Sequence, residues 1–171
     1  HGFATLALAE SYGVVEDPRI EKSLNKAVEL ILSAQARNPK GAWRYSPDSK
    51  DADTTISGCQ IVALLAARNA GIPVPDAAIE RALKYMSTCR DSSGAYGYTS
   101  RGGAKVTLTA IGSLCYSLAK MKDAKGYEKS LNYLTKNIEY RDTHYTYYFE
   151  YYMSQALFQA DEETWKIWNS Q

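Results

Sequence analysis

The segment that decides the fold is residues 54 to 70, "TTISGCQIVALLAARNA". Apolar side chains occupy almost its whole circumference at helical spacing, so we expect a helix that is covered on both faces. The segments on either side, 18–36 and 75–89, instead carry one narrow apolar stripe opposite a charged face. The stripes consist of Ile20, Leu24, Ala27, Val28, Ile31 and Ala34 in the first segment, and Ile79, Ala82, Leu83 and Met86 in the second. The sequence therefore predicts a buried helix between two exposed ones.

The same alternation continues along the chain, and no strand-like alternation competes with it. Residues 105–121 are apolar on most sides, whereas 126–138 again carry a single stripe. The remaining expected helices are 3–13, which pairs with 18–36, an aromatic-rich helix over 145–160, and a short one over 162–170. We therefore expect an all-α fold of four hairpins, each a buried helix followed by an exposed one, in a single repeat domain over 1–171. Periodicity alone does not choose between a solenoid and a closed ring.

The composition excludes several classes of function. Lys and Arg (20) nearly balance Asp and Glu (19), which gives a net charge of +1 and argues against a nucleic-acid binder. The apolar runs are too short for a membrane-spanning helix. The cysteines, at positions 59, 89 and 115, are widely spaced without a Cys-x-x-Cys pair, so we expect no disulfide framework, no metal and no cofactor.

Two loops that follow exposed helices share a Gly-x-aromatic turn. The first is "QARNPKGAWRYSPDSKDADTT" (35–55) and the second is "CRDSSGAYGYTSRGG" (89–103). They resemble the glutamine–tryptophan (QW) repeat motif of the squalene cyclase and protein prenyltransferase superfamily. Gln35, Gly41 and Trp43 match the first copy with two extra spacer residues. Gly94 and Tyr96 match the second, with a cysteine where glutamine is expected.

This resemblance implies an α/α toroid in which the buried helices form the inner ring. Such rings usually have six hairpins, so we interpret the four present here as an open arc, a fragment of a longer toroid. Its exposed apolar ends would pack against the rest of its own chain or against a second copy. The motif itself would be structural: the Gln35 amide would satisfy backbone groups at a helix end, and Trp43 and Tyr96 would fill gaps between hairpins.

Two aspartates precede the buried helix at 54–70. Class II terpene cyclases of the same superfamily carry an Asp-x-Asp-Asp-Thr motif whose middle aspartate protonates the substrate, and this chain has Asp51 and Asp53 but Thr54 in the third place. Asp53 could therefore be a general acid with Asp51 beside it. Alternatively, Asp53 or Thr54 caps the helix, and Asp51 lies near its positive end. We favour the cap.

The aromatic helix over 145–160 is the remaining candidate site. Tyr147 and Tyr151 share one face, Tyr148 lies on another, and Glu150 lies between these faces, with His144 just before the helix. Aromatic walls suit carbocations, sugars and flat ligands, whereas the simpler interpretation is packing between helices.

Three hypotheses for the function follow. The first is a non-catalytic, terpenoid cyclase-like repeat domain that binds an apolar or isoprenoid ligand, or another protein. The second is a squalene-type cyclase that uses Asp53 as its acid. The third is a helical-repeat scaffold without a pocket.

Overall fold

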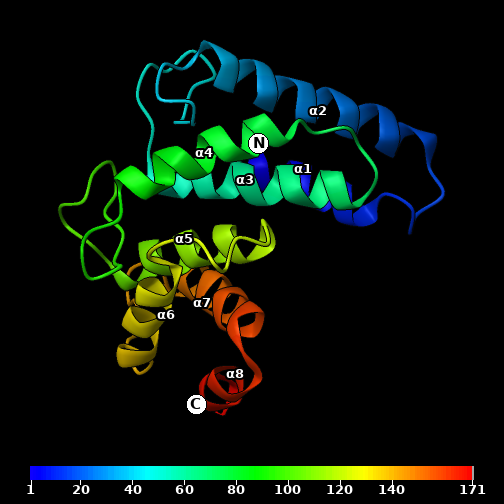
Figure 1. The fold of residues 1–171 in the computed structure, drawn as a ribbon. Coiled ribbons are helices and arrows are strands. Elements are labelled where there is room, and N and C mark those ends of the chain that lie inside the picture. Colours follow the sequence, from blue (N-terminus) through cyan, green and yellow to red (C-terminus); the bar gives the residue numbers. More distant parts are fainter. Residues whose placement is uncertain (171) are drawn as a thin grey trace. The chain divides into compact units, whose positions relative to one another are not determined.

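The computed structural model describes residues 1–170 and is all-helical over that range, with eight helices and no strand. The helices are α1 (Gly2–Ser11), α2 (Pro18–Arg37), α3 (Thr54–Asn69), α4 (Asp76–Thr88), α5 (Val106–Leu118), α6 (Tyr127–Lys136), α7 (Thr146–Ala160) and α8 (Glu162–Asn169) (Figure 1). The all-α class is therefore confirmed, and every expected helix is present with its ends within one turn of the expected positions. The arrangement as a toroid stays a prediction.

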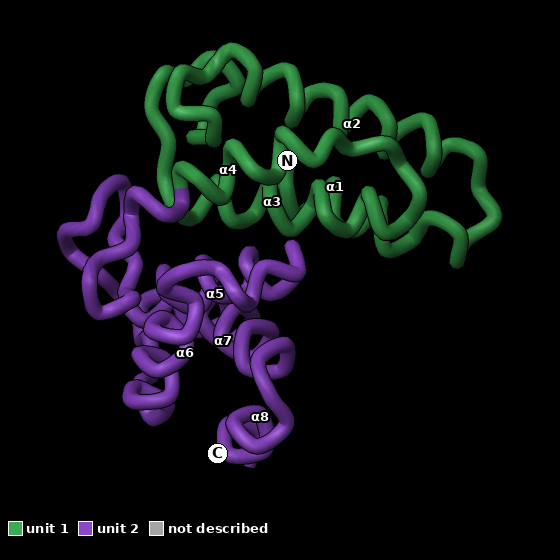
Figure 2. Tube along the Cα trace, viewed as in Figure 1, with its two compact units in different colours: residues 1–85 green, residues 86–171 purple. Residues whose placement is uncertain are grey.

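The chain divides into two compact units, residues 1–85 and 86–171, within which most close contacts occur (Figure 2). The division falls inside α4, so that helix begins in the first unit and ends in the second. The first unit holds α1, α2, α3 and most of α4, and the second holds α5 to α8.

In the first unit α3 is the central helix, with α1 and α2 packed against it (Figure 1). Its apolar residues Ile61, Ala63, Leu64 and Ala67 are fully buried. The stripe of α2 faces the same core, with Leu24, Val28 and Ile31 buried at helical spacing. α1 lies close to α3 at Gly2, which leaves no room for a side chain there: an added Cβ atom would lie only 2.5 Å from Cys59 Sγ.

In the second unit α5 takes the central position, with α6 and α7 packed against it. Every residue of α5 from Val106 to Ser117 is buried, as expected from its apolar circumference. α6 buries only its stripe, including Tyr127 and Leu134. α8 packs on α7, and Phe149 makes edge-to-face contacts with Tyr140 and Trp168. The alternation of covered and striped helices is thus confirmed from α2 to α6.

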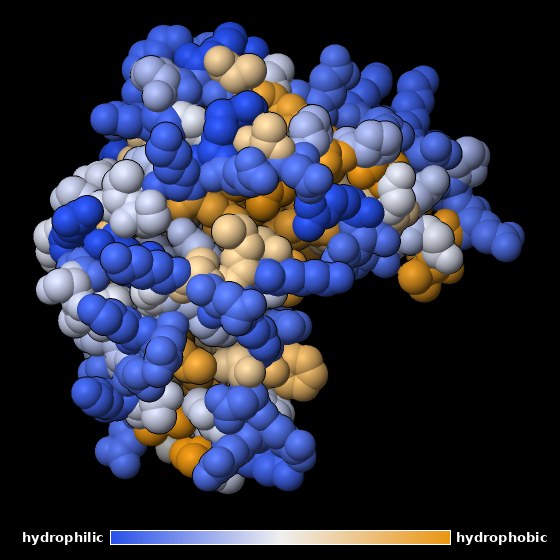
Figure 3. Space-filling view, in the orientation of Figure 1, coloured by the Kyte–Doolittle hydropathy of each residue, from blue (hydrophilic) through white to orange (hydrophobic). Residues whose placement is uncertain are grey.

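The first and seventh helices depart from the expected pattern, because each is covered on one face only. Phe3 on α1 is 49% exposed, and on α7 Tyr147 is 91% and Phe158 59% exposed. Figure 3 shows hydrophobic surface also at the α1–α2 connection, where Val14 and Val15 are exposed. The expectation that these two helices are covered is therefore wrong for their outer faces. That a second copy or more of the chain covers them stays a prediction.

The two Gly-x-aromatic turns are built around glycines in left-handed backbone conformation, Gly41 (φ 68°) and Gly94 (φ 95°). In the first turn Gln35, which is buried, donates from Nε2 to the carbonyls of Gly41 and Ala78, each at 2.8 Å. Trp43 is 4% exposed, and its Nε1 donates to the Ile31 carbonyl at 2.8 Å. Gln35 and Trp43 thus make buried hydrogen bonds to the backbone; that they hold neighbouring hairpins together, as the motif implies, stays a prediction.

The second turn fills the same role with different side chains. Tyr96 is fully buried, and its ring lies so close to Gly112 of α5 that a Cβ atom there would meet it at 2.6 Å. Arg90 donates to the Tyr96 hydroxyl at 3.2 Å and to the Lys125 carbonyl. Burial raises the pKa of Tyr96, and the neighbouring Arg90 opposes that rise only in part, so the phenol stays neutral.

The two turns hold the following helices by equivalent hydrogen bonds. The Trp43 carbonyl accepts from the backbone N–H of Asp53 at 3.1 Å, and the Trp43 N–H meets Ser57 Oγ at 3.2 Å. In the second unit the Tyr96 carbonyl accepts from the N–H of Lys105 at 3.1 Å, and the Tyr96 N–H meets Thr109 Oγ1 at 3.0 Å. Each aromatic residue is thereby bonded to the residue before the central helix and to the hydroxyl four residues later. The second unit is in this respect a structural repeat of the first.

The burial of Trp43 gives a first prediction. Trp43→Ala should lower the free energy of unfolding by about 3 kcal/mol, because it removes a buried ring together with its hydrogen bond to Ile31. Trp43→Phe keeps most of the volume and serves as the control, with a markedly smaller loss. Urea denaturation followed by circular dichroism measures both. Equal losses for the two variants would show that the ring volume is not what stabilises the turn.

The glycine turns give a second prediction, with one turn as the control for the other. At Gly94 a Cβ atom would lie 2.4 Å from the backbone carbon of Lys129, whereas at Gly41 its nearest neighbour is 3.4 Å away. Both alanine variants pay the left-handed backbone cost of about 1 kcal/mol, but only Gly94→Ala must also displace helix α6. We expect Gly94→Ala to lower the melting temperature clearly more than Gly41→Ala. The reverse order would contradict the described packing of α6 on this turn.

Candidate functional site

The amino end of α3 holds the first candidate, Asp53. Its side chain is fully buried, and its Oδ1 accepts hydrogen bonds from the Ile56 N–H at 2.8 Å and from the Thr55 hydroxyl at 2.6 Å. The backbone of Asp53 is extended (φ −138°, ψ 161°), as an N-cap requires. The capping interpretation of Asp53 is therefore confirmed. Its second oxygen, Oδ2, is buried without a hydrogen bond and lies 3.9 Å from Arg44 Nε.

Asp51 lies outside this buried environment. Its side chain is 64% exposed, and its carboxylate pairs with Arg44 Nη1 at 3.1 Å. An acid strong enough to protonate an alkene needs neighbouring groups that tune it within a dry pocket. Asp51 points instead to the surface, where Arg44 neutralises its charge. The geometry at α3 is that of a helix cap with an exposed ion pair beside it.

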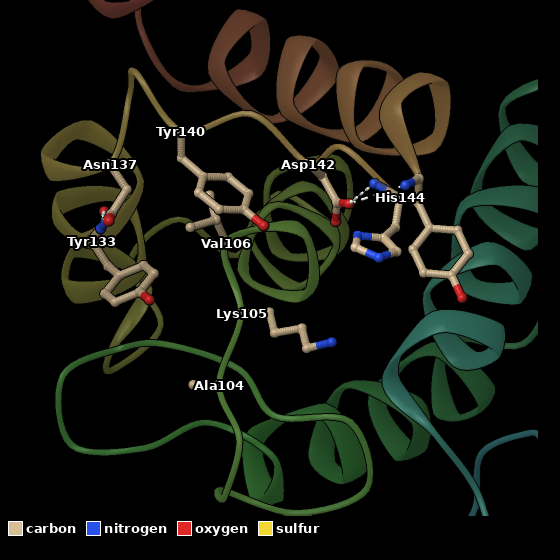
Figure 4. Close-up of a pocket in the computed structure, with 9 residues that line it drawn as sticks. Ala104, Lys105, Val106, Tyr133, Asn137, Tyr140, Asp142 and His144 are labelled. Carbon is tan, nitrogen blue, oxygen red and sulfur yellow. Dashed lines mark hydrogen bonds between the residues drawn. The ribbon is translucent and has the colours of Figure 1, made fainter.

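The second candidate is a pocket of about 510 Å³ at the amino end of α5. Three segments of the second unit line it: residues 104–106 at the start of α5, Tyr133 and Asn137 at α6, and the connection from α6 to α7 (Figure 4). The connection contributes Tyr140, Asp142, His144 and Tyr145. In Figure 4 the Lys105 side chain extends beside these residues, with its ammonium on the side of His144 rather than of Tyr133. The volume suits a small organic molecule.

Asp142 organises one wall of this pocket. Its Oδ1 accepts from the N–H groups of His144 and Tyr145, each at 3.0 Å, and its Oδ2 accepts from the Thr107 hydroxyl at 3.0 Å. Partial burial acts to raise the pKa of Asp142, but the hydrogen bonds outweigh it, so that the pKa lies below the usual value. Asp142 is therefore an ionised, internally bonded carboxylate that ties the connection to α5.

The phenol of Tyr140 also lines the pocket. Its ring packs edge-to-face on Phe149, with 5.4 Å between the centroids, which fixes its position. Partial burial, together with the nearby Asp142 and Tyr133, raises the pKa of Tyr140. The hydroxyl is thus protonated at neutral pH and can donate a hydrogen bond to a bound molecule.

The predicted aromatic ligand wall is only partly brought together. His144 lines the pocket, whereas Tyr147 is almost fully exposed and is not among the pocket residues. Tyr148 and Tyr151 are half-buried and make edge-to-face contacts with the ring of Tyr152. Glu150, expected to need a partner, lies 3.9 Å from Arg141 Nε in a half-exposed pair. These contacts are packing contacts of α7, in agreement with the simpler interpretation of that helix.

Sequence reasoning missed most of the pocket, namely Lys105, Tyr133, Asn137, Tyr140 and Asp142. These residues come from three separate segments, and nothing in their spacing predicts that the segments meet. One local signal was present: Asp142 stands two and three residues before His144 and Tyr145, a typical spacing for an aspartate that bonds the following backbone N–H groups.

The structure also bears on metals and membranes. Over residues 1–170, no group of three or more His, Cys, Asp or Glu side chains is placed to hold a metal ion. Across the same range, none of the helices is both long enough and apolar enough to cross a membrane.

Comparison with known proteins adds no relative: no protein-family model, curated protein or solved structure matches the chain.

The cap at α3 gives a third prediction. Asp53→Ala should cost about 1 kcal/mol of stability, because it removes the acceptor of the Ile56 N–H, whereas Asp53→Asn should cost little. Asp51→Ala is the control, since an exposed ion pair contributes only about 0 to 1 kcal/mol. The melting temperatures of the three variants, compared with that of the parent protein, measure these differences in stability. If Asp53→Ala melts at the temperature of the parent protein, the cap contributes nothing to stability.

Proposed function

We propose that the chain is a non-catalytic repeat domain of the terpenoid cyclase-like type, and that it binds a small molecule in the pocket at the amino end of α5. The observation that carries the binding role is the pocket itself. Its volume is about 510 Å³, and three chain segments contribute polar and aromatic side chains to it. Convergent polar groups in a partly apolar cavity are the usual mark of a small-molecule site.

Two features support the proposed family. Gln35 makes the backbone hydrogen bonds that the glutamine–tryptophan motif leads us to expect, and Trp43 is buried, as suits a side chain that fills a gap. The turn at Tyr96 repeats the hydrogen bonds of the turn at Trp43. A repeated turn of this kind is typical of architectures in which each hairpin is held against the next.

Two features favour binding over cyclase chemistry. One oxygen of Asp53 is occupied by the cap of α3, and the third aspartate of the cyclase motif is replaced by a threonine. Asp51, the only other carboxylate of the motif, is exposed and paired with Arg44. Neither neighbouring carboxylate of the cyclase motif is therefore placed to tune Asp53 as an acid.

The binding role is tested by chemical-shift mapping on ¹⁵N-labelled protein. The probes are phenyl phosphate, glucose and farnesol, which represent an aromatic anion, a sugar and an isoprenoid alcohol. We expect at least one to shift the amide signals of 104–106 and 133–145. Ala104→Trp, which adds a bulky ring to the pocket lining, should abolish these shifts while circular dichroism stays unchanged. Shifts absent for all probes, or unaffected by Ala104→Trp, would refute the binding role.

The absence of catalysis needs a separate assay. Protein incubated with squalene or geranylgeranyl diphosphate should give no cyclised product by gas chromatography and mass spectrometry. Asp53→Asn is the matched variant, because it keeps the cap but not the acid. Product formed by the parent protein and lost in Asp53→Asn would establish the cyclase hypothesis instead.

A further inference from the structure

The lining of the pocket is more polar than apolar. Among its nine residues, all within the described part of the chain, Ala104 and Val106 alone have aliphatic side chains. The others carry hydroxyl, amide, imidazole, ammonium or carboxylate groups. A hydrocarbon chain bound here would cover these groups without offering them a hydrogen bond, and each uncompensated group weakens binding. The lining therefore favours a ligand that carries its own hydrogen-bonding groups.

The lining offers acceptors as well as donors, and its lysine and its aspartate carry opposite charges. The Asp142 carboxylate accepts three hydrogen bonds from the protein, but a carboxylate can accept about four, so it can also accept from a ligand. Asn137 donates from Nδ2 to the Tyr133 carbonyl at 2.8 Å, which fixes its amide and presents Oδ1 as an acceptor. The protonated hydroxyl of Tyr140 is a donor. A hydroxyl group both donates and accepts, so a neutral ligand with several hydroxyls matches this lining.

Tyrosine rings supply the flat part of the lining. Tyr145 is 69% exposed and Tyr140 is 40% exposed, whereas Tyr133 is half-buried. The ring of Tyr145 is thus largely free of core contacts, and covering it would contribute to the free energy of binding. The electron-rich face of such a ring attracts weakly positive C–H groups, while its hydroxyl remains at the edge. A ring that carries C–H groups on its faces and hydroxyls around its rim therefore fits beside these tyrosines.

We propose, building on the binding role above, that the pocket binds a neutral saccharide. Its pyranose ring stacks on Tyr145, and its hydroxyls bond to Asp142, Asn137 and Tyr140. A pyranose has both properties that the lining calls for, since C–H groups cover its faces and hydroxyls surround it. The ligand needs no net charge, because the charges of the lining have opposite signs.

The test compares ligands that differ in charge and in hydroxyl content. The neutral saccharides are the methyl glycosides of glucose, galactose and mannose, and the reference ligands are benzyl alcohol, farnesol and phenyl phosphate. Affinities are measured on the parent protein by ¹⁵N chemical-shift titration at millimolar concentrations. We expect at least one glycoside to shift the amides of 133–145, to bind more tightly than every reference ligand, and to keep its affinity as salt is added.

The outcomes of this comparison separate the two proposals. A reference ligand that binds more tightly than all three glycosides would overturn the saccharide proposal and leave the pocket as a binding site. If none of the six compounds shifts these amides, neither the saccharide proposal nor the binding role stands.

Two exposed tyrosines provide a matched pair of variants. Tyr145 and Tyr147 are 69% and 91% exposed, but Tyr145 lines the pocket and Tyr147 does not. Tyr145→Ala should weaken glycoside binding about tenfold, because it removes the face on which the pyranose stacks, whereas Tyr147→Ala should leave it unchanged. Both variants should melt near the temperature of the parent protein, since neither ring belongs to the core. Equal glycoside affinities of the two variants would overturn the proposed stacking.

A third variant tests the hydrogen bonds to the saccharide. Tyr140→Phe removes the hydroxyl and keeps the ring that packs on Phe149. It should weaken glycoside binding about fivefold, the factor for one neutral hydrogen bond, without lowering the melting temperature. Glycoside affinity equal to that of the parent protein would show that the hydroxyls do not bond to Tyr140, against the proposal.

Discussion

The fold depends on how a buried turn satisfies its own backbone. Trp43 and Tyr96 are both buried, and their N–H and C=O groups cannot reach water. A polar backbone group that is buried without a partner costs free energy comparable to a lost hydrogen bond. In both units the solution is the same: the carbonyl accepts from the residue before the next helix, and the N–H meets a hydroxyl one turn into that helix. These bonds fix where the central helices α3 and α5 begin.

The two units differ in the side chain of the residue that directly precedes the central helix. At α3 that side chain is Asp53, and its carboxylate completes the cap, so the helix end is satisfied from within the protein. At α5 it is Lys105, and its side chain makes no capping hydrogen bond. The same scaffold therefore produces a capped helix end in one unit and, in the other, a helix whose preceding residue lines a pocket.

The tyrosine-rich segment illustrates how a helix distributes an apparently local cluster. Consecutive residues of a helix are about 100° apart, so a run of tyrosines cannot form one wall. Tyr152 is buried, Tyr148 and Tyr151 lie half-buried beside it, and Tyr147 is exposed. The pocket tyrosines come instead from α6 and from the connection that precedes α7. Aromatic content identified the region of interest, but the residues that face a ligand are those that the chain path brings together.

The sequence by itself determined the helices and their alternation, because both follow from local spacing, whereas the structural interpretation of Gln35 and Trp43 rested on the resemblance of the turn to a known motif. It also indicated the cap at Asp53, since the aspartate directly precedes an apolar helix. Only the tertiary structure decided which residues form the pocket and that Asp51 faces outward to Arg44. That one face of α1 and one face of α7 are exposed was likewise visible only in the tertiary structure. Periodicity records which faces of a helix are apolar, but not which neighbour covers them, and a pocket depends on segments meeting that are far apart in the chain.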